Sequence, residues 1–238
     1  MKHIILSVLA FITLCLCVSA SPKKFEVKKI DFNEIKNETM NPKSQYYYPK
    51  LMKSFMSNDT AMSFEDYRYL YYGYVFQEDY SPFRTSDFSN VIEPLYYKKE
   101  FTRADCDTIE KYAALSLDDN IFDLRQMKFY IFALKEKKKF ARASIRQFRL
   151  NHLLAAILSS GNGSKENPWV VNSVEHEYNI LNFLGFVATS HKEMDGNIDY
   201  ITIDKTGKDD KTPEGYYFDI SKVMEVANLK FPDRRKAN

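Results

Sequence analysis

Apolar residues recur at helical spacing through the first two thirds of the chain. The clearest helical face follows Ser63 and carries four large residues at positions i, i+3, i+4 and i+7, namely Tyr67, Leu70, Tyr71 and Tyr74. Ser63 and Asp66 form the capping-box pattern that begins such a helix. The same spacing predicts further helices over residues 44–57, 103–117, 121–137 and 140–160. Short loops between them indicate helical hairpins, which are repeat-like and tetratricopeptide-like at best, because no 34-residue period recurs.

The tyrosine-rich helix is apolar on two sides, because Tyr69, Tyr72 and Phe76 form a second face. A helix of this kind is typically packed between neighbours. The first face therefore predicts core positions, whereas Tyr69 and Tyr72 are candidates either for the core or for a surface that stacks on sugars or on a partner's peptide. Arg68 lies among these rings and is a candidate for an anion or cation–π contact.

The pattern changes after Gly163. Residues 169–171 read as a short strand, and a helix capped by Asn172 or Ser173 follows. Alternation predicts strands over 186–193 and 197–204, joined by a two-residue turn at Asp195-Gly196, and a third strand over 216–220. In that register Lys192 would lie opposite Asp199, and His191 opposite Tyr200. This part of the chain is predicted to be a small α+β module with an antiparallel sheet.

We therefore expect an α+β protein in three parts, namely a signal peptide over residues 1–20, a helical-hairpin region over 21–160 and the α+β module over 161–238. Lys2 and His3 precede an apolar stretch, and the small residues Ser19 and Ala20 offer a cleavage site. The apolar stretch is shorter than the roughly 20 residues that a membrane span needs. The predicted location is the periplasm or the cell exterior, and the sequence leaves both open.

Composition narrows the classes of function. The net charge of +2 disfavours a nucleic-acid binder. After cleavage Cys106 would be the single cysteine, so no internal disulfide is expected, and its place on an apolar helix face indicates a small core residue rather than a nucleophile.

The strongest charge feature is basic. Seven lysines and arginines lie within residues 135–149 against one acid, Glu136. One helical stripe begins at Lys138 or Lys139 and continues through Arg142, Arg146 and Arg149; Lys139 and the three arginines are the candidate binding residues. This stripe could bind anionic lipid headgroups, an acidic glycan or an acidic partner. The alternative is a solvated helix face whose charges pair with acids elsewhere in the chain.

No metal site, cofactor or catalytic residue is predicted. Glu175, His176 and Glu177 are adjacent, and adjacent helical residues point in different directions. The glycines within residues 159–164 lack the lysine and the serine or threonine of a phosphate-binding loop. These residues are expected to end a helix instead.

Several segments resemble a family of secreted Bacteroidetes proteins catalogued as domain of unknown function 4919 (DUF4919). The similar segments, in chain order, are residues 41–44, 47–51, 67–73, 160–163, 177–178 and 217–220. The resemblance spans most of the chain after residue 20. It implies export and a helical part followed by a β part, and it implies no activity.

The leading hypothesis is an exported, non-catalytic binding protein of the bacterial envelope, with an unidentified protein or glycan as its partner. A secreted or periplasmic hydrolase is the alternative, with carboxylates that no linear motif reveals. A structural or envelope-stress protein is a third hypothesis.

Overall fold

The computed structural model describes residues 27–230. The predicted signal peptide, residues 1–20, lies outside the described residues. Across residues 27–230, no helix combines the length and the apolar character that a membrane span requires.

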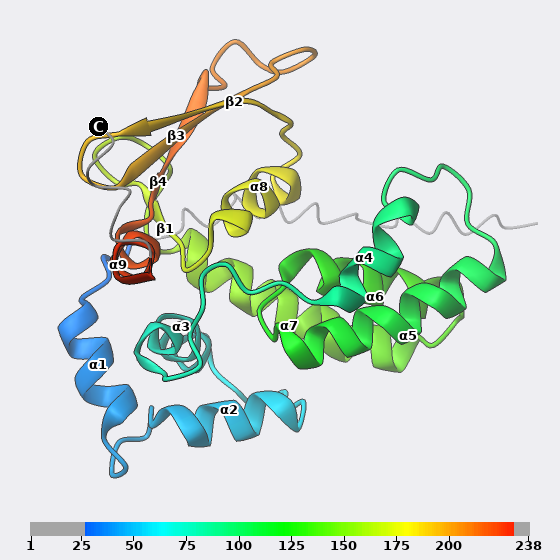
Figure 1. The fold of residues 1–238 in the computed structure, drawn as a ribbon, viewed down its shortest axis with the longest axis horizontal. Coiled ribbons are helices and arrows are strands. Elements are labelled where there is room, and N and C mark those ends of the chain that lie inside the picture. The colour runs from blue at the N-terminus through cyan, green and yellow to red at the C-terminus, as the bar shows by residue number, and fades with distance from the viewer. Residues whose placement is uncertain (1–26, 231–238) are drawn as a thin grey trace, which may run out of the picture.

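The described chain is an α+β protein, as predicted, with most of its helices in the N-terminal part. The helices are α1 (Phe32–Met40), α2 (Tyr48–Met56), α3 (Phe64–Gly73), α4 (Asp87–Ile92), α5 (Arg103–Asp119), α6 (Leu124–Glu136), α7 (Phe140–Leu158), α8 (Val174–Phe183) and α9 (Ser221–Lys230). Two 3₁₀ turns, Tyr74–Phe76 and Glu93–Leu95, extend α3 and α4. The strands are β1 (Trp169–Val170), β2 (Ala188–Met194), β3 (Ile198–Ile203) and β4 (Gly215–Asp219). Figure 1 shows α4 to α7 gathered on one side of the molecule and the sheet on the other.

The predicted helix starts are confirmed at two positions. Ser63 and Asp66 form a capping box at α3, and Thr102 and Asp105 form one at α5. In each box the hydroxyl accepts from the backbone N–H three residues on, and the carboxylate accepts from the backbone N–H of the cap. Three helices were not predicted, namely α1, α4 and α9, and α4 lies within a segment that reads as an irregular connection.

The sheet has the order β1-β4-β3-β2. Its β2–β3 and β3–β4 pairs are antiparallel, as predicted, and β1 adds a parallel pair with β4 at one edge. The predicted hairpin register was wrong by one residue. Asn197 joins Gly196 in the left-handed region, with φ of 59° and 81°, and the turn takes three residues instead of two. Glu193 therefore pairs with Asp199, and His191 with Ile201.

One hydrophobic core joins the two predicted regions. It contains Tyr67 and Tyr71 from α3 together with Ile180 from α8 and Ile201 from β3. A second cluster around Cys106, which is buried as predicted, lies among α4, α5, α6 and α7. The boundary at residue 160 thus marks a change of secondary structure across a shared core.

Candidate functional site

The tyrosine-rich helix α3 lies in the core on both of its faces. Tyr67, Tyr71 and Tyr74 are buried, as predicted. Tyr69 is 5% exposed and Tyr72 is 0% exposed, so neither ring offers the open surface that a binding role requires. Tyr72 donates from its hydroxyl to the carbonyl oxygen of Val170 at 3.1 Å.

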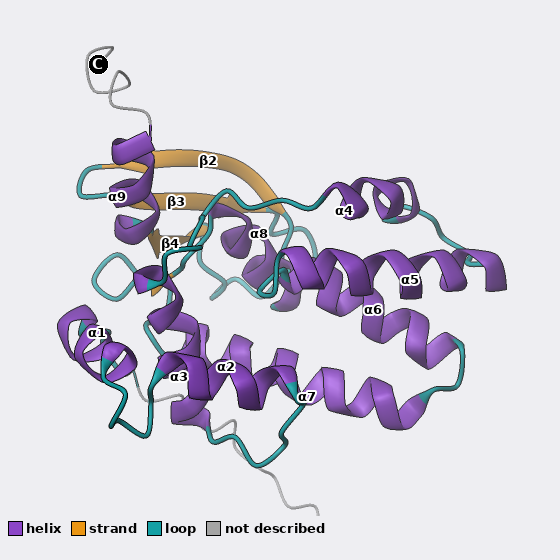
Figure 2. Cartoon of the chain, turned by 60° about the horizontal axis from the view of Figure 1, so that its bottom comes forward, coloured by secondary structure: helices purple, strands orange, loops and turns teal. Residues whose placement is uncertain are grey.

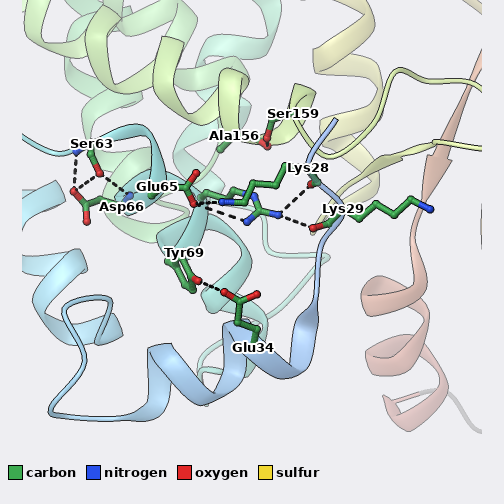
Figure 3. A network of polar contacts seen from close by, with 10 residues as sticks. Lys28, Lys29, Glu34, Ser63, Glu65, Asp66, Tyr69, Ala156 and Ser159 are labelled. Carbon is green, nitrogen blue, oxygen red and sulfur yellow. Dashed lines mark hydrogen bonds and ion pairs between the residues drawn. The ribbon is translucent and has the colours of Figure 1, made fainter. Parts of the chain in front are cut away.

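The unpredicted helix α1 covers the second face of α3. Tyr69 donates from its hydroxyl to the carboxylate of Glu34 in α1, as Figure 3 shows, and its ring stacks on Tyr46 with centroids 3.9 Å apart. Arg68 is also buried and donates to the carbonyl oxygens of Lys28 and Lys29 at 3.1 and 2.8 Å. These contacts make Arg68, Tyr69 and Tyr72 packing residues of the core. Of the two alternatives for Tyr69 and Tyr72, the structure thus favours the core over an exposed binding surface.

The predicted basic stripe on α7 does not form one exposed surface. Lys139 donates to both carboxylate oxygens of Glu110 in α5, at 2.6 and 2.8 Å, and Arg142 donates to the same carboxylate at 3.0 Å. The guanidinium of Arg146 lies 5.2 Å from the ring centre of Tyr130. Lys139 and Arg142 therefore match the alternative given above, in which the charges of the stripe pair with acids of the same chain.

Arg149 is the buried end of the stripe. Its guanidinium lies 3.7 Å from the ring centre of Phe55 and donates to the side-chain oxygen of Asn58 at 2.9 Å. Burial lowers the pKa of Arg149 to about 10, and the nearby charge of Arg146 adds to the effect. Both interactions hold Arg149 as a packing residue.

One end of the stripe opens into a surface pocket of about 460 Å³. Its lining combines an aromatic ring, a hydroxyl and several charges, from Phe101, Thr102, Arg103, Cys106, Glu136, Lys137, Lys138 and Lys139. The start of α5 and the α6–α7 turn form it, and Figure 2 shows both at the end of the helical part that points away from the sheet. Of the residues predicted to bind, Lys139 alone reaches this pocket.

The α6–α7 turn places Lys138 in an uncommon backbone conformation. The N–H of Lys139 donates to the carbonyl of Leu134 at 2.8 Å, and the N–H of Lys138 donates to that of Lys135 at 2.9 Å. This is the pair of bonds that ends a helix in the Schellman motif, whose left-handed residue is usually glycine. Here that residue is Lys138, with φ of 58°. The turn thus holds an exposed lysine where glycine would be less strained.

Two of the four basic residues at the pocket already have partners. Lys137 pairs with Asp107 and Glu110, and Lys139 pairs with Glu110. Burial raises the pKa of Glu110, but hydrogen bonds from both lysines outweigh it and lower that pKa to about 2. The side chains of Arg103 and Lys138 form neither a hydrogen bond nor an ion pair with any residue that the structure describes, although the charge of Arg103 helps to lower the pKa of Asp107. The pocket therefore presents two cations that are free of ion pairs.

Cys106 lies at the inner side of this pocket. Burial raises the pKa of its thiol, and the charges of Glu136 and Asp105 raise it further. A thiol with a raised pKa is a poor nucleophile at neutral pH, because the thiolate is the reactive form. Cys106 is therefore not activated as a nucleophile in this pocket.

A second polar cluster lies at the sheet, where Glu177 of α8 meets His191 of β2 and Asp199 of β3. One ligand atom from each residue lies within 4.8 Å of the other two, and Nε2 of His191 is 2.9 Å from Oδ2 of Asp199. This cluster was not predicted, because the expected register placed His191 opposite Tyr200 instead of Ile201. Alternation along β3 is the signal that was available, since it places Asp199 on the face of Ile201 and Ile203.

The adjacent residues Glu175, His176 and Glu177 do not converge, as predicted. Glu175 is exposed, His176 contacts Tyr71, and Glu177 points toward Asp199. The cluster thus takes only one residue from this stretch.

Comparison with known families gives one match. The model of a family described as Domain of unknown function (DUF4919) matches residues 33–228. No curated protein and no solved structure matches the chain.

Proposed function

The chain belongs to the DUF4919 family, whose description gives no activity, and we propose from its geometry that this member is an exported, non-catalytic binding protein for an acidic sugar. The proposed site is the pocket between the start of α5 and the α6–α7 turn.

The observation that carries the proposal is the placement of Lys138. Strained left-handed backbone at a non-glycine residue costs on the order of 1 kcal/mol, and such positions concentrate at functional sites. Lys138 combines that conformation with an exposed ammonium group at the pocket, beside the second free cation, Arg103. A carboxylate or a sulfate group on a ligand could accept charge-assisted hydrogen bonds from both cations.

The shape of the site favours a small ligand over a membrane or a protein surface. A cavity of about 460 Å³ falls within the range of small-molecule sites. Phe101 provides an aromatic ring for the C–H face of a sugar, and Thr102 provides a hydroxyl that can hydrogen-bond. These features support the acidic glycan over the other anionic ligands that the basic stripe indicates.

Export is supported by the sequence. Residues 1–20 have the charge, apolar core and small residues of a signal peptide. The chain after them has a single cysteine, Cys106, so an oxidising compartment would form no disulfide within it. Envelope glycans would then be accessible to the protein.

The test is calorimetric titration with a sulfated disaccharide and with the same disaccharide lacking sulfate. We expect binding of the sulfated form only. Lys138→Asn keeps a residue that tolerates the left-handed conformation but removes the charge, and Arg103→Gln removes the second free cation. Each should weaken binding about 10-fold or more, because a charge-assisted hydrogen bond contributes about 1.5–3 kcal/mol.

Lys165→Gln is the matched control, because Lys165 is exposed in the loop before β1 and forms no ion pair within the described residues. It should bind like the wild-type chain. Equal weakening by all three substitutions would indicate a general charge effect and would contradict a site at the pocket.

The alternative, a hydrolase, is favoured by one observation, the carboxyl pair Glu177 and Asp199. Paired carboxyl groups can serve as general acid and general base. Both side chains are almost fully buried, however, at 0% and 1% exposed, and a scissile bond needs direct access to them. A screen of glycosidase and peptidase substrates tests this alternative. Activity in the wild-type chain that is lost in Asp199→Asn would favour a hydrolase over a binding protein.

A further inference from the structure

The Glu177–His191–Asp199 cluster points to a second kind of ligand, independent of the proposed sugar pocket. Within the described residues, neither carboxylate oxygen of Glu177 has a hydrogen-bond donor, and Oδ1 of Asp199 has none either. Burying a carboxylate without a donor or a cation costs several kcal/mol. Glu177 has no such partner, and Asp199 has only His191, at Oδ2. A cation held between the two carboxylates would offset this cost.

The fold brings the three side chains together from separate elements. Asp199 lies on the core face of β3, and His191 lies on the same face of the neighbouring edge strand β2, because it pairs with Ile201. Glu177 reaches them from α8, whose residues Ile180 and Leu181 share one core cluster with Ile201. A helix, a central strand and an edge strand thus fix the cluster from three directions.

We propose that Glu177, His191 and Asp199 bind a divalent transition-metal ion, with zinc as the best match. One imidazole nitrogen and carboxylate oxygens from two residues form a donor set that suits zinc. Calcium and magnesium prefer oxygen ligands alone, and the imidazole disfavours them.

The distances fit one ion. Ligand bonds of about 2 Å in tetrahedral geometry separate the donor atoms by roughly 3.3 Å. The His191–Asp199 separation of 2.9 Å is already close to that value, and the limit of 4.8 Å for the whole set leaves Glu177 a short rotation of its side chain. Three protein ligands leave a fourth coordination position, and His191, with its side chain 40% exposed, marks the solvent side.

Glutamine has nearly the shape of glutamate and buries no charge beside Asp199. Glu177→Gln should keep the fold while it removes a ligand.

The test is equilibrium dialysis of the purified, tag-free chain against zinc chloride, followed by measurement of bound zinc and of the melting temperature. We expect one zinc per chain and a melting temperature that rises with zinc concentration. Glu177→Gln and His191→Gln should each lose stoichiometric zinc while their metal-free melting temperatures stay near that of the wild-type chain.

Glu175→Gln is the matched control, because Glu175 lies on the same helix but is exposed and outside the cluster. It should bind zinc like the wild type. The proposal is overturned if the wild-type chain binds no stoichiometric zinc, if Glu177→Gln and His191→Gln retain it, or if calcium binds in its place. Lys138→Asn should leave zinc binding intact, which separates this site from the sugar pocket.

Discussion

The hydroxyl of Tyr71 lies 2.7 Å from Nδ1 of His176, and both side chains are fully buried. Nε2 of His176 lies 2.9 Å from the carbonyl oxygen of Phe122, so Nε2 carries the proton and Nδ1 accepts from Tyr71. The same phenol oxygen accepts from the backbone N–H of Asn172 at 3.1 Å. One hydroxyl thus links α3 to the start of α8 and to the segment before it.

Removing this hydroxyl should destabilise the protein. Tyr71→Phe leaves the Nδ1 of His176 and the N–H of Asn172 unsatisfied in the core, and we expect the free energy of unfolding to fall by about 2–4 kcal/mol. Tyr67→Phe is the control on the same helix, because the Tyr67 hydroxyl is buried without a partner in the described chain. That substitution should be neutral or stabilising in urea unfolding. Equal losses in the two variants would contradict the network.

A neighbouring pair of groups should give opposite pH dependences. Burial lowers the pKa of His176 from 6.5 to about 4, against the effect of its bond to Phe122. Between these values the unfolded chain binds the proton and the folded chain does not, so acidification removes about 3 kcal/mol of stability. Burial raises the pKa of Asp123 from 3.8 to about 6, so the folded chain binds this proton first and acidification adds a similar amount.

Two variants separate these contributions when unfolding is measured at pH 7 and pH 4. Compared with the wild type, His176→Gln should gain about 3 kcal/mol on acidification, and Asp123→Asn, which keeps a capping side chain, should lose about 3 kcal/mol. Using differences from the wild type cancels the contribution of Glu177. Changes of the same sign in both variants would contradict this assignment.

The core position of Tyr72 has a direct test. Tyr72→Ala should lower the free energy of unfolding by about 3–5 kcal/mol, as expected for loss of a large buried ring. Tyr72→Phe removes only the bond to Val170 and should cost about 1 kcal/mol. Thermal and urea unfolding both measure the difference. A Tyr72→Ala chain as stable as the wild type would contradict the core position of Tyr72.

Lys138 should show a trade between stability and binding. Lys138→Gly relieves the left-handed strain and should raise the free energy of unfolding by about 1 kcal/mol while it weakens binding of the sulfated disaccharide. Lys138→Ala keeps the Cβ atom, so it should weaken binding without the gain in stability. A glycine variant that is less stable than the alanine variant would contradict the role of strain.

The sequence predicted the features that depend on nearby residues. The capping box at Ser63, the helix start at Arg103 and the buried face of Tyr67 and Tyr71 follow from spacings of three or four residues. The burial of Tyr69 depends on α1, which supplies Glu34, a residue 35 positions away. No local pattern specifies such a neighbour.

In the candidate sites, too, the contacts between residues distant in the chain were not predictable from local patterns. Glu110, which pairs with Lys139, lies 29 residues away in the chain, so the basic stripe gave no sign of its internal pairing. Asn197 adopts a left-handed conformation that shifts the β2–β3 register by one residue. That shift decided whether His191 met Asp199 or a tyrosine, because one residue reverses the face of every side chain.

Binding at the α5 pocket is tested most directly by an NMR titration of the ¹⁵N-labelled chain with the sulfated disaccharide. We expect saturable shifts at the amides of Arg103, Cys106 and Lys138, with the amides of the sheet unchanged, and loss of these shifts in Lys138→Asn. Shifts that concentrate elsewhere, or a spectrum that the disaccharide leaves unchanged at saturating concentration, would contradict the proposed function.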